Sequence, residues 1–309
     1  MLAQPDRPNQ GGFLKSRTQH RNPINRFCDW LEATVLVEGV TTYPDVADFL
    51  KETLVYDSEQ FAWEFLGDVQ SEIRRRAILL EDAYPFSHAA GEDLRERPCA
   101  SRDAYAFCLT LSLPFLYQAW ATDHVPKAGD HRTLFESLAE QACVRIFPGW
   151  HVINFAWSSK TPAEKGSVVD RVANELHGTV RDRTIFAQAN DGGVDILCHR
   201  RFADSLGGYP ALLVQCASGI TNYTNKAVEP NLNLWREAVQ LRNYPKRALT
   251  IPFALDGDEL RGLTSAADGV VIDRLRMLAP FSNEPPIAAF SAELSAWTDG
   301  ALAALPRFT

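Results

Sequence analysis

The chain has 309 residues, of which 46% are hydrophobic and 23% are charged, and this composition and length are typical of a globular protein with two domains. Its formal net charge of −8 argues against a simple DNA-binding module, although a nuclease needs basic residues along only one cleft. No apolar run approaches the roughly 20 residues that span a bilayer, so no membrane contact is expected.

The first 125 residues are predicted to form a polar arm followed by a helical domain. Residues 1–24 are rich in Pro, Gln, Asn and Arg and contain no apolar signal segment, so we expect a flexible arm there. Residues 25–125 carry apolar side chains at helical spacing. The expected helices cover 25–36, 45–54, 60–80 and 104–120, the last with an interruption near Pro114. Residues 121–130 are interpreted as a linker.

From residue 131 onwards, helical and strand-like patterns alternate, which predicts an α/β domain with a mixed sheet over residues 131–309 and a C-terminal helical extension. The turn residues Leu206-Gly-Gly-Tyr-Pro indicate a hairpin between two of the strands. The expected strands cover 150–157, 193–201, 211–217, 247–254 and 269–278. The expected helices cover 133–147, 167–179 and 231–241.

An acid and an amide are predicted to lie on one face of this hairpin. Alternation along the two strands places Asp195 and Gln215 on faces that meet if the strands pair through the turn. A carboxylate in the middle of an apolar strand is costly to bury without a partner, which favours a functional role for Asp195. Its oxygens, the Gln215 side-chain carbonyl and the backbone carbonyl of Cys216 are ligands that suit Mg²⁺. A metal-ion site is therefore expected at this hairpin.

The order helix, strand, strand with Asp, strand with Gln, helix, strand resembles the PD-(D/E)xK nuclease superfamily, and within it the Mrr-like restriction endonucleases. The segments Asp191-Gly-Gly-Val-Asp195 and Val214-Gln215-Cys216 match the two strand motifs of that family. The likeness covers about residues 131–256. It implies a restriction-endonuclease-like domain that hydrolyses DNA phosphodiester bonds with Mg²⁺ (or Mn²⁺), in restriction or anti-phage defence.

The chain departs from the family at one position. The family's lysine would lie two residues after Gln215, where this sequence has Ala217. Lys226, at or just before the next helix, is the candidate that could take its place and position the attacking water. If it does not, the alternative is a catalytically inactive nuclease-fold subunit that binds nucleic acid or scaffolds a defence complex.

The superfamily also takes an acid from its first core helix, which the resemblance assigns to Glu136 because this residue lies near the helix start. Glu140 on the same helix and Glu175 on the inserted helix remain open, and the pattern around each of the three acids alone is more typical of a solvated surface acid. Asp191 is interpreted as a turn residue. His199 lies further along the strand of Asp195 and is expected at the surface.

The sequence also gives expectations about partners and compartment. A nuclease without an evident specificity module is expected to act with a partner, such as an ATPase or sensor protein docked on the helical domain, and a homodimer is also possible. Six cysteines without a CxxC pair indicate reduced thiols of a cytoplasmic protein. The run Arg74-Arg75-Arg76 is interpreted as the solvated face of a helix rather than a phosphate site. DNA and RNA substrates are not distinguished.

Overall fold

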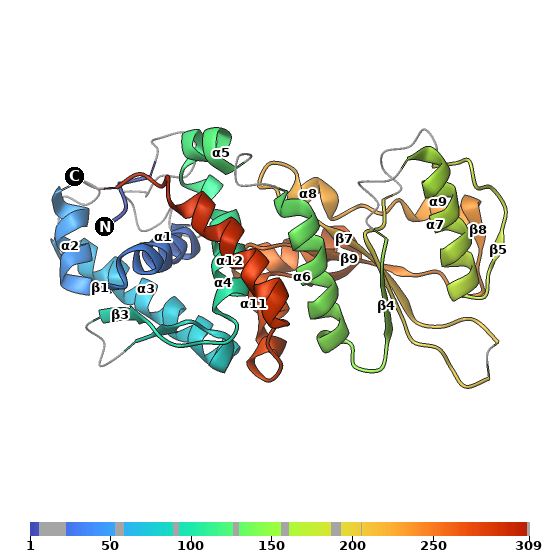
Figure 1. Ribbon diagram of the computed structural model, residues 1–309, viewed down its shortest axis with the longest axis horizontal. Helices are drawn as coiled ribbons and strands as arrows, with labels where there is room; N and C mark the ends of the chain where they lie inside the picture. The colour runs from blue at the N-terminus through green and yellow to red at the C-terminus, as the bar shows by residue number, and fades with distance from the viewer. Residues whose placement is uncertain are drawn as a thin grey trace. The chain divides into compact units, whose positions relative to one another are not determined.

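The computed structural model is a mixed α/β protein that divides into two compact units (Figure 1). The structure describes residues 1–5, 23–52, 59–88, 93–125, 130–155, 161–186, 193–204 and 206–307. Unit 1 comprises residues 1–131, 252–256 and 278–309. Unit 2 comprises residues 132–251 and 257–277. Within the described residues, no helix has the length and apolar character needed to cross a lipid bilayer.

Unit 1 is built mainly from helices packed around a small antiparallel sheet. The helices are α1 (Pro23–Glu38), α2 (Tyr43–Glu52), α3 (Glu59–Leu80), α4 (Arg102–Ser112), α5 (Gln118–His124) and α12 (Ala288–Leu302). The sheet has the strand order β1 (Val40–Thr42), β3 (Asp93–Glu96), β2 (Phe86–Ser87). Helix α4 is buried over its whole length from Ala104 onwards and packs against α1 and α12, because a helix that is apolar all round needs neighbours on every side.

The expected helices of unit 1 are present, and the expected break at Pro114 is confirmed. A 3₁₀ turn, Leu113–Phe115, separates α4 from α5. Helix α5 continues to His124, so part of the expected linker is helical; residues 126–129 lie outside the described residues.

The two chain ends differ from the sequence-based expectation. Residues 6–22 of the predicted arm lie outside the described residues, but Leu2 is fully buried and forms a β-bridge with Arg307. The backbone oxygen of Ala3 accepts hydrogen bonds from the side chains of Trp30 and Tyr117. At the other end, α12 packs on α4, so residues 278–309 belong to unit 1 rather than forming an extension of the second domain.

The interpretation of Arg74-Arg75-Arg76 as a solvated face is wrong for Arg76. Its guanidinium group is fully buried and donates hydrogen bonds to Asp29 at 2.8 Å and Glu32 at 2.9 Å, with Glu72 at 3.1 Å. One face of α3 therefore carries a buried ionic network between helices α1 and α3. The other two arginines are exposed as expected.

Unit 2 is organised around a five-stranded mixed sheet with the strand order β10-β9-β7-β6-β4. The strands are β4 (His151–Asn154), β6 (Ile196–His199), β7 (Ala211–Cys216), β9 (Lys246–Thr250) and β10 (Gly269–Ile272). Strands β4, β6 and β7 are antiparallel neighbours, whereas β7, β9 and β10 run parallel. The β6–β7 hairpin turns through Gly207 and Gly208, which both have positive φ, as the turn sequence predicts.

Helices cover this sheet, and a small ribbon adjoins them. The helices are α6 (His131–Ile146), α7 (Pro162–Glu175), α8 (Tyr223–Lys226), α9 (Leu232–Ala238), α10 (Gly257–Ala267) and α11 (Arg274–Leu278). Strands β5 (Thr179–Val180) and β8 (Val239–Gln240) pair antiparallel to form the ribbon. The helix expected over 231–241 therefore ends early, because its last residues join β5. The strand expected over 269–278 ends at Ile272, and Asp273 then caps α11 by accepting a hydrogen bond from the Arg276 N–H.

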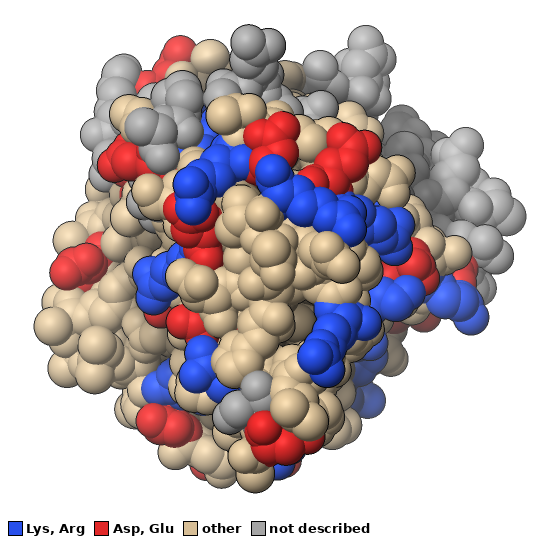
Figure 2. Space-filling view, turned by 90° about the vertical axis from the view of Figure 1, so that its right-hand side faces the viewer, with Lys and Arg blue, Asp and Glu red and all other residues tan. Residues whose placement is uncertain are grey.

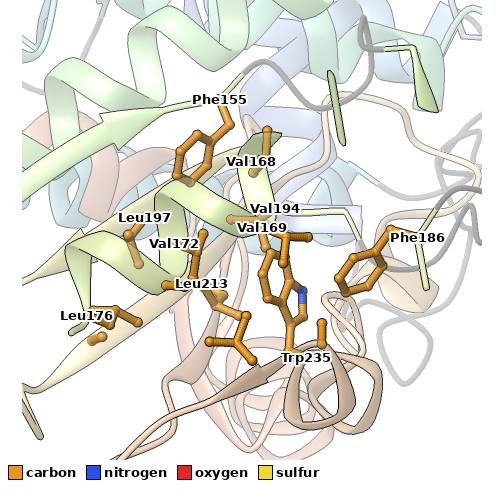
Figure 3. Close-up of a cluster of buried hydrophobic side chains, with 14 residues drawn as sticks. Phe155, Val168, Val169, Val172, Leu176, Phe186, Val194, Leu197, Leu213 and Trp235 are labelled. Atoms are coloured by element: carbon orange, nitrogen blue, oxygen red, sulfur yellow. The ribbon is translucent and has the colours of Figure 1, made fainter. Parts of the chain in front are cut away.

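One face of the sheet packs into an apolar core with α7 and α9 (Figure 3). Leu197 of β6 and Leu213 of β7 lie opposite each other in the pairing and both belong to this core. Trp235 of α9 stacks at a tilt on Phe186, with ring centroids 4.7 Å apart. The buried Cys198 of β6 also lies close to the buried Cys143 of α6 and raises the pKa of its thiol. The middle of β6 is thus buried from both sides.

Candidate functional site

Asp195 directly precedes β6 and lies beside the end of β7 that carries Gln215. Ile196 lies opposite Val214 in the register, and Asp195 is one residue further along. The Asp195 N–H donates to the Val214 oxygen at 3.0 Å, which continues the ladder beyond the end of β6. The structure therefore places Asp195 and Gln215 on neighbouring segments of the same sheet.

Asp195 is a carboxyl group in a nearly dry environment. It is only 2% exposed, and its Oδ2 accepts a hydrogen bond from the Cys216 N–H at 2.7 Å. Its pKa is raised from 3.8 to about 7, mainly by burial and also by the negative charge of Glu136, while the Cys216 hydrogen bond and the charge of Lys226 act in the opposite direction. The group therefore changes protonation state near neutral pH.

Gln215 supplies a second buried oxygen beside this carboxyl group. Its side chain is 7% exposed, and its Oε1 has no hydrogen-bond partner among the described residues. An unsatisfied buried acceptor destabilises a folded protein by about 1–3 kcal/mol, so such an atom calls for an explanation. A carboxylate and an amide carbonyl on adjacent strands are the oxygen donors that a hard cation takes, and the two residues fit Mg²⁺ in their chemistry.

The thiol of Cys216 does not add to this donor set. Burial raises the pKa of this thiol well above its usual value, so the sulfur stays protonated. Only the backbone carbonyl of Cys216 remains as the ligand that sequence analysis assigned to it. The described residues contain no group of three or more His, Cys, Asp or Glu side chains arranged to hold a metal ion.

Lys226 stands at the end of the short helix α8, where its charge acts on the Asp195 carboxyl group. Its Nζ forms an ion pair with Oε2 of Glu229 at 2.6 Å. Its positive charge also lowers the pKa of Asp195, while Glu229 raises it. Sequence analysis missed Glu229; its spacing of three residues from Lys226, which is typical of an ion pair along a helix, is the signal that could have indicated it.

The three candidate helix acids have different surroundings in the structure. Glu136 on α6 is 7% exposed and raises the pKa of Asp195 by its charge. Glu140, one turn later, accepts a hydrogen bond from Nδ2 of Asn154 at 3.2 Å. Glu175 on α7 binds Nε2 of His199 at 3.2 Å and also pairs with Arg201. Glu136 is therefore the acid that contributes to the environment of Asp195.

The expectation that His199 lies at the surface is wrong. Its side chain is fully buried, and its ring stacks on His151 with centroids 5.1 Å apart. Burial lowers the pKa of His199. The cause is its position in the middle of the sheet, where β4 and Glu175 of α7 enclose it. Asp191, the expected turn residue, lies outside the described residues.

Comparisons with protein-family models, with curated proteins and with solved structures found no match for this chain. Its function is therefore inferred from its own residues. Asp195 offers a carboxyl group that ionises near neutral pH, Gln215 offers a free buried oxygen, and Lys226 offers a nearby positive charge. These groups can hold a divalent cation and stabilise negative charge on an oxygen atom.

Proposed function

We propose that this protein is a metal-dependent nuclease that hydrolyses DNA phosphodiester bonds, with a role in restriction or anti-phage defence. The observation that carries the proposal is the presence of two buried oxygen-bearing side chains, Asp195 just before β6 and Gln215 on the neighbouring strand β7, with the charge of Lys226 acting on Asp195. The sheet order also supports it, because an antiparallel pair that continues into parallel strands is the arrangement implied by the resemblance to PD-(D/E)xK nucleases.

Each residue has a role in the proposed reaction. Asp195 and Gln215 would hold Mg²⁺ (or Mn²⁺), which when bound stabilises charge on a phosphoryl oxygen and lowers the pKa of a water molecule. Asp195 must be ionised to bind a cation. Lys226 orients the attacking water and offsets the negative charge that accumulates around phosphorus. Glu136 assists through a water molecule and adds negative charge to the site.

Cleavage of linear and supercoiled DNA in the presence of Mg²⁺ or Mn²⁺ tests this proposal. We expect metal-dependent cleavage that is abolished in Asp195→Asn and strongly reduced in Lys226→Ala. The surface pair of Lys246 and Asp268 in the same unit provides matched controls, and Lys246→Ala and Asp268→Asn should cleave like the wild type. Cleavage that survives in Asp195→Asn would disprove this site.

One observation favours a second candidate function, a catalytically inactive nuclease-fold subunit that binds nucleic acid or scaffolds a defence complex. The motif position carries Ala217, and Glu229 neutralises the only lysine assigned to replace it. The variant Glu229→Gln separates the two functions, because it releases Lys226 and leaves Asp195 in place. An enzyme should keep or increase its metal-dependent cleavage in this variant. An inactive subunit should cleave in no variant while it still binds DNA.

A partner protein, such as an ATPase or sensor that docks on unit 1, belongs to either version of the proposal. The identification of a protein that co-purifies with this chain would not by itself distinguish the nuclease from the inactive subunit. The cleavage assay with Glu229→Gln does so directly, because it changes only the charge that pairs with Lys226.

A further inference from the structure

The excess of acidic over basic residues is distributed unevenly between the two units. Unit 2 contains 17 Lys and Arg against 15 Asp and Glu, whereas unit 1 contains 14 against 24, so their net charges are +2 and −10. The unit that carries the candidate site is therefore the basic one, despite the net charge of −8 for the whole chain.

Basic side chains of unit 2 gather around the small β5–β8 ribbon. Figure 2 shows the side of the protein on which Figure 1 draws α7, α9, β5 and β8, and Lys and Arg side chains form a curved row across it. Helix α7 contacts both strands of the ribbon, and α9 leads directly into β8. Four exposed arginines come from these elements and the residues that follow them: Arg171, Arg181, Arg236 and Arg242, which we call the arginine face.

These four arginines are not neutralised within the protein. None of them forms an ion pair with an acidic side chain of the described residues, whereas the neighbouring Arg183 pairs with Asp170. The guanidinium group of Arg171 lies over the Phe155 ring, 5.6 Å from its centroid, and Arg236 lies 5.4 Å from the centroid of Tyr244. Stacking on aromatic rings orients these two groups; Nη1 of Arg236 also donates to Oδ1 of Asn233 at 3.1 Å, and neither guanidinium group is paired with a carboxylate of the described residues.

The arginine face is connected to the candidate site through Phe155. The N–H of Phe155 donates to the backbone oxygen of Asp195 at 2.7 Å, and the ring of Phe155 carries Arg171. Two consecutive contacts, the stacking of Arg171 on Phe155 and the hydrogen bond from Phe155 to Asp195, thus link a phosphate bound by Arg171 to the site. Of the remaining arginines, Arg181 follows β5 and Arg242 lies two residues after β8, and these two strands pair with each other.

We propose that the arginine face binds the phosphate backbone of a DNA duplex and holds it at the candidate site; this inference rests on the proposed function. Arginine is suited to phosphate because its planar group donates two parallel hydrogen bonds. A duplex is favoured over a single strand, which proteins usually bind by stacking bases on exposed aromatic rings. Among the described residues of unit 2, Phe202 is the only exposed Phe, Tyr or Trp.

The experiment measures binding without cleavage, so that it does not depend on nuclease activity. Fluorescence anisotropy with a labelled duplex in EDTA, over a series of KCl concentrations, gives the dissociation constant and its salt dependence. For B-DNA the slope of log K against log [salt] is about −0.9 for each phosphate contacted. Arg181→Ala/Arg242→Ala should weaken binding on every sequence and make the slope less steep by about 2.

The control is a double variant with the same change in net charge. Arg95→Ala/Arg261→Ala removes two arginines that pair with Asp93 and Asp258 outside the arginine face, and it should bind like the wild type. The inference is overturned if both double variants weaken binding equally, if the slope does not change, or if the protein binds vesicles of anionic lipid and no duplex. Binding that depends on the arginine face without any cleavage would retain the inference and reject the nuclease.

Discussion

The substitution Asp195→Asn is expected to stabilise the protein above neutral pH. Asn has nearly the shape of Asp, and its side-chain oxygen can still accept the hydrogen bond from the Cys216 N–H. It carries no charge at any pH. The substitution therefore removes the burial of a carboxylate while it keeps the packing at the end of β6.

The magnitude follows from the pKa of Asp195, which burial raises from 3.8 to about 7. Between these two values the folded protein binds a proton that the unfolded chain has released, so the free energy of unfolding falls as the pH rises. Below 3.8 both states are protonated, and above about 7 the full penalty is present. A shift of about 3 units corresponds to a loss of about 4 kcal/mol at alkaline pH.

Urea denaturation in EDTA at about pH 4 and about pH 8 measures this effect. The difference in free energy of unfolding between Asp195→Asn and the wild type should increase in favour of the variant by about 4 kcal/mol across this range. Asp268→Asn is the control, because Lys246 lowers the pKa of that exposed carboxylate and the substitution should not be stabilising at pH 8.

The reasoning is refuted if Asp195→Asn is equally or less stable than the wild type at about pH 8, or if the difference between them does not change with pH. Either result would mean that the carboxyl group is solvated or paired, in contrast to its 2% exposure and single side-chain hydrogen bond among the described residues.

Three further predictions concern the same two units. Mg²⁺ should raise the melting temperature of the wild type at alkaline pH and leave Asp195→Asn unchanged, because a ligand that binds only the folded state stabilises it; equal shifts in thermal melts would contradict this. Arg76→Met should lower the free energy of unfolding by about 3–5 kcal/mol in urea titrations, because the buried carboxylates of Asp29 and Glu32 would lose their ion pair with Arg76; a loss below about 1 kcal/mol would contradict it. Because burial lowers the pKa of His199 from 6.5, its contribution to stability is lost as the pH falls below that value, and the wild type should lose more stability than His199→Gln on acidification; parallel pH profiles would count against it.

Much of the fold could be predicted because its signals are local. The hairpin of β6 and β7 combines apolar alternation with a Gly-Gly turn, and both strands are present and pair antiparallel, with Ile196 opposite Val214. The interruption at Pro114 is a property of a single residue, because proline cannot continue a helix interior without losing a hydrogen bond.

Features that depend on tertiary contacts could not be predicted in this way. The end of α9 is set by the pairing of Val239 with Val180, a residue far away in the sequence. His199 has the polarity of a surface residue, and only the enclosing strand β4 and Glu175 bury it. Likewise, nothing in the run Arg74-Arg75-Arg76 shows that the last arginine meets carboxylates of α1.

The residues of the candidate site also divide into those with a local sequence signal and those that depend on tertiary contacts. Asp195 and Gln215 could be predicted, because a polar residue within an apolar strand is visible in the sequence. The choice of Glu136 among three acids, and the presence of Glu229 beside Lys226, required the arrangement of α6, α8 and the sheet in space. Electrostatic interactions between side chains of different helices and strands leave no periodic pattern in a sequence.

The contrast between the two units bears on why Asp195 is present at all. Where this chain buries charge in unit 1, it pairs it: Arg76 donates to Asp29, Glu32 and Glu72, and two tyrosine hydroxyls also donate to Glu32. In unit 2, by contrast, the buried Asp195 accepts one side-chain hydrogen bond, and Oε1 of Gln215 has no partner among the described residues. A buried carboxyl group without an ion-pair partner and an unsatisfied buried amide oxygen reduce stability, and apolar residues of similar size would remove that cost. The network around Arg76 shows that this chain can pair buried charges, so a cation that completes the Asp195 and Gln215 oxygens would explain why they are kept, and this argument supports the metal site independently of any sequence motif.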